Sequence, residues 1–210
     1  MAGAPVLVFY AAVTPVPIVV ISFVIGGIPF AWLIVRLLMK TDVRNHGSGN
    51  VGATNAARCF PKRYRLTAFV GIFLLDAAKG YVAAAVLPEA MGYPLEPWPA
   101  AAGLAAILGH IFTPFLKTLG GKGVATTIGV FFALDPLAIA IGLGAFFLVY
   151  ALTRTVALGS IALAIALPVA TWLHGTAGNS VLSLTIVVAV LVVLRHTSNI
   201  RRIVGGTEPQ

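Results

Sequence analysis

Long apolar segments alternate with short polar stretches along this chain. Apolar runs cover 17–39, 66–87, 99–116, 124–134, 137–153, 156–173 and 180–194. Most of them approach or exceed the roughly 17–25 residues that a helix needs to cross a bilayer. The pattern predicts an all-α integral membrane protein with seven transmembrane helices, forming a single domain over residues 1–210.

The run 124–134 is short, because its 11 residues rise only about 16 Å as a helix. We expect this helix to begin earlier, within the glycine-rich stretch 120–123, or the bilayer to be thinner around it. Asp135 and Pro136 follow, where a helix should break. The alternative is one bent crossing over 124–153, which would leave six spans.

The placement of charge decides between these two topologies. Lys and Arg gather in 40–65, 117–122, at Arg154 and in 195–202, whereas Glu89, Glu96 and Asp135 lie in the other connections. Seven spans put every loop cation on one side of the membrane, while six put Arg154 and the tail on the other side. The positive-inside rule favours seven. We therefore expect a multi-pass protein of the cell membrane, with its N-terminus outside and its C-terminus in the cytoplasm.

Composition excludes an ordinary soluble domain. Hydrophobic residues make up 59% and charged residues 10% of the 210 positions, against about 25% charged in a typical soluble domain. Residues 1–15 contain no Lys or Arg, so the first apolar run is expected to be a retained helix and not a cleaved signal. Cys59 is the single cysteine, which excludes an intramolecular disulfide.

The most polar connection, residues 45–55, reads Asn-His-Gly-Ser-Gly-Asn-Val-Gly-Ala-Thr-Asn. Glycines let a backbone approach a ligand closely, and successive amides in such a turn can cradle an oxyanion. Hydroxyl and carboxamide groups add donors, and Arg58 adds a fork suited to phosphate. The alternative is a flexible, soluble loop. The candidate phosphate-binding residues of this loop are Gly47, Ser48, Gly49, Asn50, Gly52, Thr54, Asn55 and Arg58.

A second candidate phosphate site is the stretch Gly120-Gly121-Lys122-Gly123, which precedes an apolar run. Free amides and the dipole at a helix N-terminus favour an anion there. The stretch is not a Walker A loop, because Gly123 and not a hydroxyl residue follows Lys122, so a nucleotidase is not indicated. A simple glycine turn is the alternative.

The tail holds a third polar cluster, Arg195, His196 and Asn199. His196 and Asn199 are three residues apart and so share one face of a helix. A basic end that fixes the last span is the alternative, and it does not require His196 or Asn199. Under the seven-span topology all three polar stretches lie on the cytoplasmic side and can converge.

Ionisable residues also occur within the apolar runs. Asp76 and Lys79 lie one helical turn apart in the second run, and His110 lies near the end of the third. A buried charge in a membrane span is by default a functional hypothesis. For Asp76 and Lys79 the alternative is a structural pair that braces the bundle. His110 could be a buried donor to the backbone or a contact to ligand, and we expect it to support the site.

Several ordered motifs together resemble one family. They are Gly47 to Asn55 with Arg58, Asp76-x-x-Lys79-Gly80, Gly109-His110, Gly120 to Thr126, and Arg195 to Arg201 followed by Gly206-Thr207-Glu208. This set resembles the bacterial acyl-phosphate:glycerol-3-phosphate acyltransferases, the PlsY family, nearly end to end. The resemblance implies a seven-helix membrane enzyme that moves a fatty acyl group from acyl phosphate to the 1-position of glycerol 3-phosphate. The products would be lysophosphatidate and inorganic phosphate.

The resemblance also implies roles for the polar residues. Ser48, His196 and Asn199 become candidate catalytic residues. The loop residues above become candidate substrate ligands, together with His110, Gly120, Gly121, Lys122, Gly123 and Arg195. The first loop would hold acyl phosphate, while Lys122, His196 and Asn199 help to place glycerol 3-phosphate. No cofactor, metal or nucleic-acid partner is expected; the partners are the two substrates and the lipid bilayer.

The motifs contain no nucleophile–base–orienter set of the kind that covalent acyl transfer requires. Acyl phosphate is already activated, so direct attack by the glycerol hydroxyl is chemically sufficient. We therefore expect no acyl-enzyme. The hydroxyl proton could pass to a substrate phosphate oxygen, as the resemblance suggests, or to His196. We favour the substrate, with His196 as a positioning donor.

The chain departs from the family pattern at Leu119, where a lysine is usual, at Gly26-Gly27-Ile28, where a Gly-Ser-Ile is usual, and at Ala157, where a serine is usual. An inactive scaffold is therefore one alternative. A transporter of a phosphorylated solute is another. Placement of all three motifs on one face argues against transport, because alternating access needs a site reachable from both sides.

Overall fold

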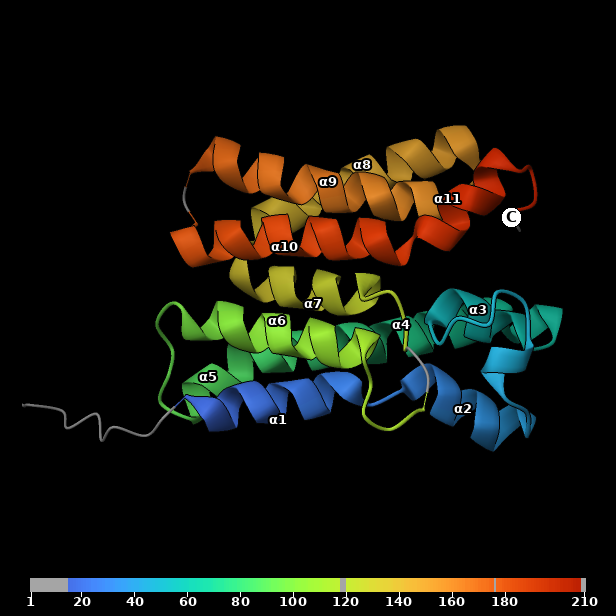
Figure 1. Ribbon diagram of the computed structural model, residues 1–210, viewed down its shortest axis with the longest axis horizontal. Coiled ribbons are helices and arrows are strands. Elements are labelled where there is room, and N and C mark those ends of the chain that lie inside the picture. Colours follow the sequence, from blue (N-terminus) through green and yellow to red (C-terminus); the bar gives the residue numbers. More distant parts are fainter. Residues whose placement is uncertain (1–14, 118–119, 176, 209–210) are drawn as a thin grey trace, which may run out of the picture.

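The computed structural model describes residues 15–117, 120–175 and 177–208, and every regular element in these ranges is a helix. The longer helices run side by side along the length of the molecule (Figure 1). Their bounds are α1 Val16–Gly27, α2 Phe30–Met39, α3 Ala53–Arg58, α4 Arg65–Tyr81, a π-helical turn Val82–Val86, α5 Leu87–Ala90, α6 Trp98–Ile111, α7 Val124–Leu134, α8 Pro136–Thr153, α9 Val156–His174, α10 Asn179–Arg195 and α11 Thr197–Val204.

These helices identify a multi-pass membrane protein. Segments 16–39, 62–90, 136–153 and 156–174 are long and apolar enough to cross a bilayer. The bent pair α10 and α11, with a 49° angle between them, adds a fifth candidate span. Helices α6 and α7 are apolar but shorter, at 14 and 11 residues. The all-helical prediction is confirmed in the described residues, and the count of seven crossings stays a prediction.

Three apolar runs fold differently from the sequence expectation. The first is broken between α1 and α2 at Ile28 and Pro29, because proline has no N–H to continue the helical ladder. The third ends at Ile111, five residues early. Helix α7 begins at Val124 and not within the glycine stretch. Gly123 has a left-handed φ of 86°, which lies outside the helical range, so the helix cannot extend back through it.

Glycines let the helices approach closely around the broken first span. A Cβ on Gly26 would lie 2.1 Å from the carbonyl oxygen of Ala106, and one on Gly109 would lie 2.0 Å from that of Phe23. Helices α1 and α6 therefore pack backbone against backbone. Small residues at helix interfaces are the usual means of close packing within a membrane.

Asp135 forms the predicted break between α7 and α8. It accepts a hydrogen bond from the Ala138 amide at 3.0 Å, which caps the first turn of α8. It also accepts from Thr171 at 2.8 Å and contacts His174 at 3.0 Å, both on α9. One buried carboxylate thus ties the turn to the neighbouring helix.

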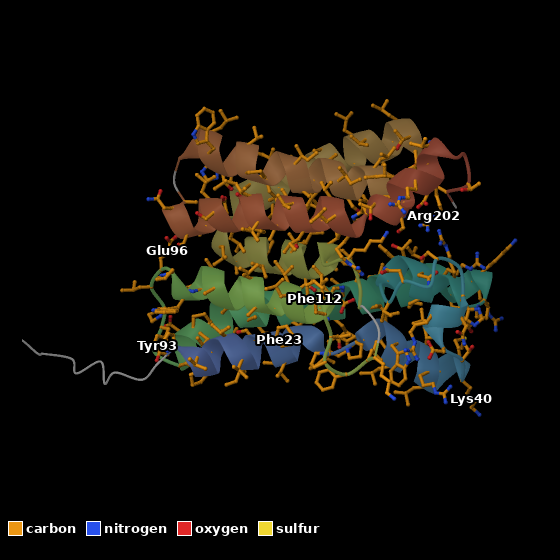
Figure 2. The ribbon with its side chains drawn as sticks, in the orientation of Figure 1. Phe23, Lys40, Tyr93, Glu96, Phe112 and Arg202 are labelled. Carbon is orange, nitrogen blue, oxygen red and sulfur yellow. The ribbon has the colours of Figure 1, made fainter. Side chains whose placement is uncertain are left out.

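The two ends of the bundle differ in charge. Lys40 and Arg202 lie at the end that also carries α2, α3 and α11, while Tyr93 and Glu96 lie at the opposite end (Figure 2). The polar loops between α2 and α3 and between α6 and α7 therefore reach the basic end. This arrangement brings the sequence motifs into one region.

Candidate active site

A cavity of about 440 Å³ lies at the basic end, where the three polar motifs meet. Its walls come from the loop before α3, the glycine stretch before α7, and the junction of α10 with α11. The lining residues are Arg44, Ser48, Gly49, Asn50, Gly120, Lys122, Leu194, Arg195, Thr197, Ser198 and Arg202. Residues more than 140 positions apart in the sequence thus share one polar cavity.

Asn55 organises the first loop from within. Its side-chain amide donates to the carbonyls of Val43, His46 and Asn50 at 2.9–3.1 Å, and its Oδ1 accepts from the Ser48 amide at 3.0 Å. The side chain is 2% exposed and does not line the cavity. Asn55 therefore holds the loop in shape, where the sequence predicted a contact to substrate.

The glycines of this loop serve that shape. Gly47 and Gly49 have φ of 54° and 71°, a region that glycine enters without strain. A Cβ on Gly47 would lie 2.3 Å from Oδ1 of Asn55. The resulting turn leaves Ser48 exposed, and Ser48 lines the cavity together with Gly49 and Asn50.

The remaining loop candidates do not line the cavity. Thr54 is exposed on α3, while Gly52 caps the start of that helix. Arg58 is half-buried at the end of α3, and its side-chain Cδ lies 3.4 Å from the position of a Cβ on Gly47. Arg58 thus lies beside the loop and outside the cavity lining.

Arg44 lines the cavity and was not singled out from the sequence. Its Nε and Nη2 donate to the two oxygens of Asp42 at 2.9 and 2.6 Å, and Trp32 donates to the same carboxylate at 3.2 Å. The hydrogen bonds from Arg44 hold the pKa of Asp42 well below its usual range. An Asp-x-Arg spacing directly before the glycine loop was the signal available in the sequence.

The glycine stretch before α7 places Lys122 in the cavity lining, while two of its backbone amides donate to carbonyls at the end of α6. Gly120 donates to the carbonyl of Ile111 at 2.8 Å, and Gly121 donates to that of His110 at 3.1 Å. Those two amides are therefore engaged, and the expected anion nest does not include them. Nη2 of Arg195 donates to the carbonyl of Gly121 at 3.3 Å, which ties the stretch to α10.

Lys122 is the charged centre of the cavity. Its Nζ donates to Oδ1 of Asn199. Burial lowers the pKa of Lys122 to about 8. The negative charge of Glu208 raises this pKa in part. The positive charges of Arg202, Arg195 and Arg58 lower it further. The site therefore concentrates positive charge that an anionic ligand would neutralise.

Glu208 completes the tail cluster and was also missed as a site residue. Its carboxylate accepts from Nε of Arg202 at 2.7 Å and from the Asn199 amide. Burial favours a higher pKa for Glu208, but the bonds from Arg202 and Asn199 more than offset that effect and lower it. The cluster orients Asn199 so that its oxygen faces Lys122.

His196 is buried beside the cavity, just beyond the end of α10. Its Nδ1 donates to the carbonyl of Val192 at 2.7 Å. Burial lowers the pKa of His196 to about 4, and the charge of Lys122 contributes to the shift. The ring is neutral near pH 7, and its other nitrogen, Nε2, is an acceptor. The expected role of His196 as a positioning donor stays a prediction; in this tautomer the donor Nδ1 already bonds to Val192.

His110 lies behind the glycine stretch and does not line the cavity. A Cβ on Gly121 would lie 2.0 Å from Nε2 of its ring. Leu119, one of the departures from the family pattern, lies outside the described residues, and Ala157 is buried in α9, away from the cavity lining.

The chemistry of the cavity wall suits phosphate. Four cationic side chains, Arg44, Lys122, Arg195 and Arg202, line it together with the hydroxyl groups of Ser48, Thr197 and Ser198. Arginine forks and lysine are the usual partners of phosphate oxygens. Among the described residues, no group of three or more His, Cys, Asp or Glu side chains comes together in a way that could hold a metal ion.

Comparison with known proteins gives one consistent result. Residues 16–206 match the family model described as glycerol-3-phosphate acyltransferase. A protein of that name from Geobacter metallireducens is 46% identical over 188 residues, which cover 89% of this chain and 92% of the relative. One from Aquifex aeolicus is 35% identical over 192 residues, covering 91% and 96%.

Solved structures agree with the family match. The glycerol 3-phosphate form of PlsY (YgiH), an integral membrane glycerol 3-phosphate acyltransferase, superposes with a TM-score of 0.83 at 34% identity. The lysophosphatidic acid form of PlsY gives a TM-score of 0.80 at 33% identity. Each superposition covers 93% of this chain and 94% of the solved one.

Proposed function

Because the chain belongs to the glycerol-3-phosphate acyltransferase family, we propose that it moves a fatty acyl group from acyl phosphate to the 1-position of glycerol 3-phosphate. The products are lysophosphatidate and inorganic phosphate. The protein is a multi-pass membrane enzyme and a glycerol-3-phosphate acyltransferase. Family membership gives the acyltransferase activity on glycerol 3-phosphate. The identity of the acyl donor, the position acylated and the roles of the residues are proposed here.

The observation that carries the proposal is the cluster of four cations around one cavity. Acyl phosphate and glycerol 3-phosphate each bring a phosphate, and the two repel each other when they meet. Arg44, Lys122 and Arg195 reduce that repulsion and align the reacting groups, which are effects of electrostatics and proximity.

The placement at one end of the bundle suits a lipid donor. Burying one CH₂ gains about 0.8 kcal/mol, so a sixteen-carbon chain would lose on the order of 10 kcal/mol on leaving the hydrocarbon. An enzyme whose phosphate site lies at the end of its apolar helices lets the chain stay in the bilayer. The activated phosphate then reaches the cavity from the membrane surface.

The transfer proceeds in one displacement. The 1-hydroxyl oxygen of glycerol 3-phosphate attacks the carbonyl carbon of the acyl phosphate, and the bond from that carbon to the phosphate oxygen breaks. The hydroxyl proton passes to a phosphate oxygen of a substrate, and the electron pair leaves with inorganic phosphate. Arg195 stabilises the charge that builds on the leaving group, while Lys122 holds the phosphate of glycerol 3-phosphate.

Ser48, His196 and Asn199 position the reactants. Ser48 offers a hydroxyl donor to phosphate at the cavity wall. The neutral His196 offers Nε2 as an acceptor for the glycerol hydroxyl, which orients an oxygen lone pair for attack. Asn199 holds Lys122 through Oδ1. Cys59 is no activated nucleophile, because burial raises the pKa of its thiol.

The topology belongs to the same proposal. Seven spans with the N-terminus outside and the C-terminus inside put the basic end, with Lys40 and Arg202, in the cytoplasm (Figure 2). Glu96 then lies on the outer side. The positive-inside rule and the one-sided placement of the site support this orientation. A transporter of a phosphorylated solute is disfavoured, because the motifs reach one end only.

Phosphate release tests the donor directly. Purified protein is given acyl phosphate with or without glycerol 3-phosphate, and inorganic phosphate and lysophosphatidate are both measured. We expect equal amounts of the two products, and neither above background without the acceptor. Acyl-thioester donors serve as the matched comparison. Transfer from a thioester at the same rate, with none from acyl phosphate, would overturn the proposed donor.

A further inference from the structure

A buried charged group connects the broken first span to the second. Lys79 Nζ lies 2.7 Å from Oδ1 of Asp76 and donates to the carbonyl of Ile28 at 2.9 Å. Asp76 and Lys79 are 2% and 4% exposed, and neither lines the cavity. Ile28 follows the last residue of α1, where carbonyls lack partners within the helix. The ammonium group therefore satisfies both a carboxylate and a helix end.

The same carboxylate faces His110 on α6. Nδ1 of His110 lies 3.6 Å from Oδ1 of Asp76, and the ring is 7% exposed. Helices α1, α4 and α6 thus share one polar contact inside the bundle. Thr113 adds a further tie, because its hydroxyl donates to the carbonyl of Gly27 at 2.6 Å.

The opposite side of His110 supports the glycine stretch. Its carbonyl accepts from the Gly121 amide at 3.1 Å. Its ring fills the space next to Gly121, since a Cβ there would lie 2.0 Å from Nε2. Gly121 directly precedes Lys122, so the ring and the carbonyl of His110 together fix where the lysine leaves the backbone.

A purely structural ion pair does not explain this arrangement. A buried pair is often replaceable by apolar residues without loss of stability. Here the charged pair lies next to His110, and Nε2 on the opposite edge of that ring lies next to Gly121 of the glycine stretch. The chain of contacts runs from Ile28 through Lys79, Asp76 and His110 to Gly121.

We propose that Asp76 and His110 are positioning residues for phosphate binding. Asp76 orients the ring of His110, and His110 holds Gly121 so that Lys122 meets Asn199 at the cavity. This inference rests on the proposed function only in taking the cavity as a phosphate site. It gives the buried charges of the second span a role in ligand binding besides bracing the helices.

The test uses inorganic phosphate as the probe and needs no turnover. The apparent Kd of phosphate is obtained from the rise in melting temperature of the purified, full-length protein with phosphate concentration. His110→Asn keeps a polar group near Nδ1, facing Asp76, and removes the ring edge beside Gly121. We expect the apparent Kd to rise about tenfold or more, because small misplacements of a binding group are costly.

A double-mutant cycle separates positioning from general weakening. In the native protein, Lys122→Ala should raise the apparent Kd strongly. In the His110→Asn background, Lys122→Ala should add little, because the lysine is already misplaced. The same factor in both backgrounds, or a lowered melting temperature with an unchanged Kd for His110→Asn, would overturn the proposal.

Asp76 is tested with its partner neutralised, because an unpaired Lys79 inside the span would itself disturb folding. Asp76→Asn with Lys79→Met should raise the apparent Kd as His110→Asn does. Asp135→Asn is the matched control, because that carboxylate is also buried, at 4% exposure, but lies in the turn between α7 and α8. The control should lower only the melting temperature. A normal Kd in the Asp76 double variant would refute the role of Asp76.

The outcomes distinguish this inference from the proposed function. A native protein that binds phosphate but transfers nothing from acyl phosphate would contradict the proposed donor and leave the positioning test intact. Normal transfer with additive effects of His110→Asn and Lys122→Ala would contradict the positioning role alone.

Discussion

Nζ of Lys122 donates a hydrogen bond to Oδ1 of Asn199, a residue 77 positions later in the chain. This contact joins the glycine stretch before α7 to the tail helix α11, and Glu208 holds the other side of the same amide. The lysine is thereby held at the cavity wall before any ligand arrives. A preorganised charge costs little reorganisation during the reaction.

Lys122→Ala should remove a charge-assisted contact to phosphate, worth about 1.5–3 kcal/mol. We expect a fall of roughly 10- to 150-fold in apparent affinity for glycerol 3-phosphate or in turnover, measured by steady-state kinetics. Lys117→Ala is the matched control, because Lys117 is exposed in the same connection and does not line the cavity. Near-normal kinetics for the Lys122 variant would contradict the phosphate site.

The affinity for glycerol 3-phosphate should weaken as the pH rises through about 8. The pKa of Lys122 is lowered to about 8, so the protonated, phosphate-binding form is full below pH 7 and is lost above pH 8. His196, with a pKa of about 4, stays neutral and contributes no change between pH 6 and 9. KM measured from pH 7 to 9.5 checks this, with Lys122→Arg as the variant whose KM should stay flat. A pH-independent KM in the native enzyme would refute the assignment.

Asn55→Ala should disorder the first loop, because the Ser48 amide and the Asn50 carbonyl lose the partner that the side chain supplies. The carbonyls of Val43 and His46 keep only their backbone hydrogen bonds. Leaving a buried backbone group unpaired costs about 1–3 kcal/mol. We expect a lower melting temperature together with a loss of activity. Asn45→Ala is the matched control: Asn45 is exposed in the same connection, and its variant should behave like the native protein. Full activity of Asn55→Ala would show that the loop shape does not depend on this amide.

Cysteine labelling tests the topology in a Cys59→Ser background. Single substitutions Lys62→Cys, Glu96→Cys and Thr207→Cys are treated with an impermeant thiol reagent on intact cells. The proposed orientation predicts labelling of the Glu96 position alone, because Lys62 and Thr207 then lie in the cytoplasm. Labelling at Thr207 from outside would contradict seven spans with a cytoplasmic C-terminus.

Cys59→Ser should keep its activity, and acyl phosphate alone should give no burst of phosphate. The thiol is no activated nucleophile, and the direct displacement needs none. Mass spectrometry of the protein after incubation with acyl phosphate, without the acceptor, checks for an added acyl group. A trapped acyl-protein that then yields lysophosphatidate would replace the single displacement by a two-step mechanism.

The site could be foreseen in part, because its motifs are compact in the sequence. The glycine loop, Lys122 and the His196–Asn199 pair were all visible as polar interruptions of apolar runs. The loop and Lys122 line one cavity, whereas His196 and Asn199 are buried outside its lining and Asn199 accepts a hydrogen bond from Lys122. Arg44, Arg202 and Glu208 were missed as site residues. Arg44 pairs with Asp42, and Arg202 pairs with Glu208. These contacts orient the side chains at the cavity, and the residue types alone do not show them.

The roles within the motifs needed the fold. Asn55 looks like any loop donor in the sequence, but its four bonds run inward to the loop itself. The amides of Gly120 and Gly121 look free, but the carbonyls of Ile111 and His110 occupy them. Which way a side chain points depends on segments that lie far away in the sequence.

The sequence by itself determined the class of protein, the helical character of its apolar runs and the break at Asp135–Pro136. These features follow from local physics, since the hydropathy of a run and the missing N–H of proline act without distant partners. Only the tertiary structure decided that Lys79 donates to the Ile28 carbonyl, that the His110 carbonyl accepts from Gly121 and that Nδ1 of His196 donates to the Val192 carbonyl. Inside a bundle each polar group must find a partner, and the partner is chosen by how the helices pack.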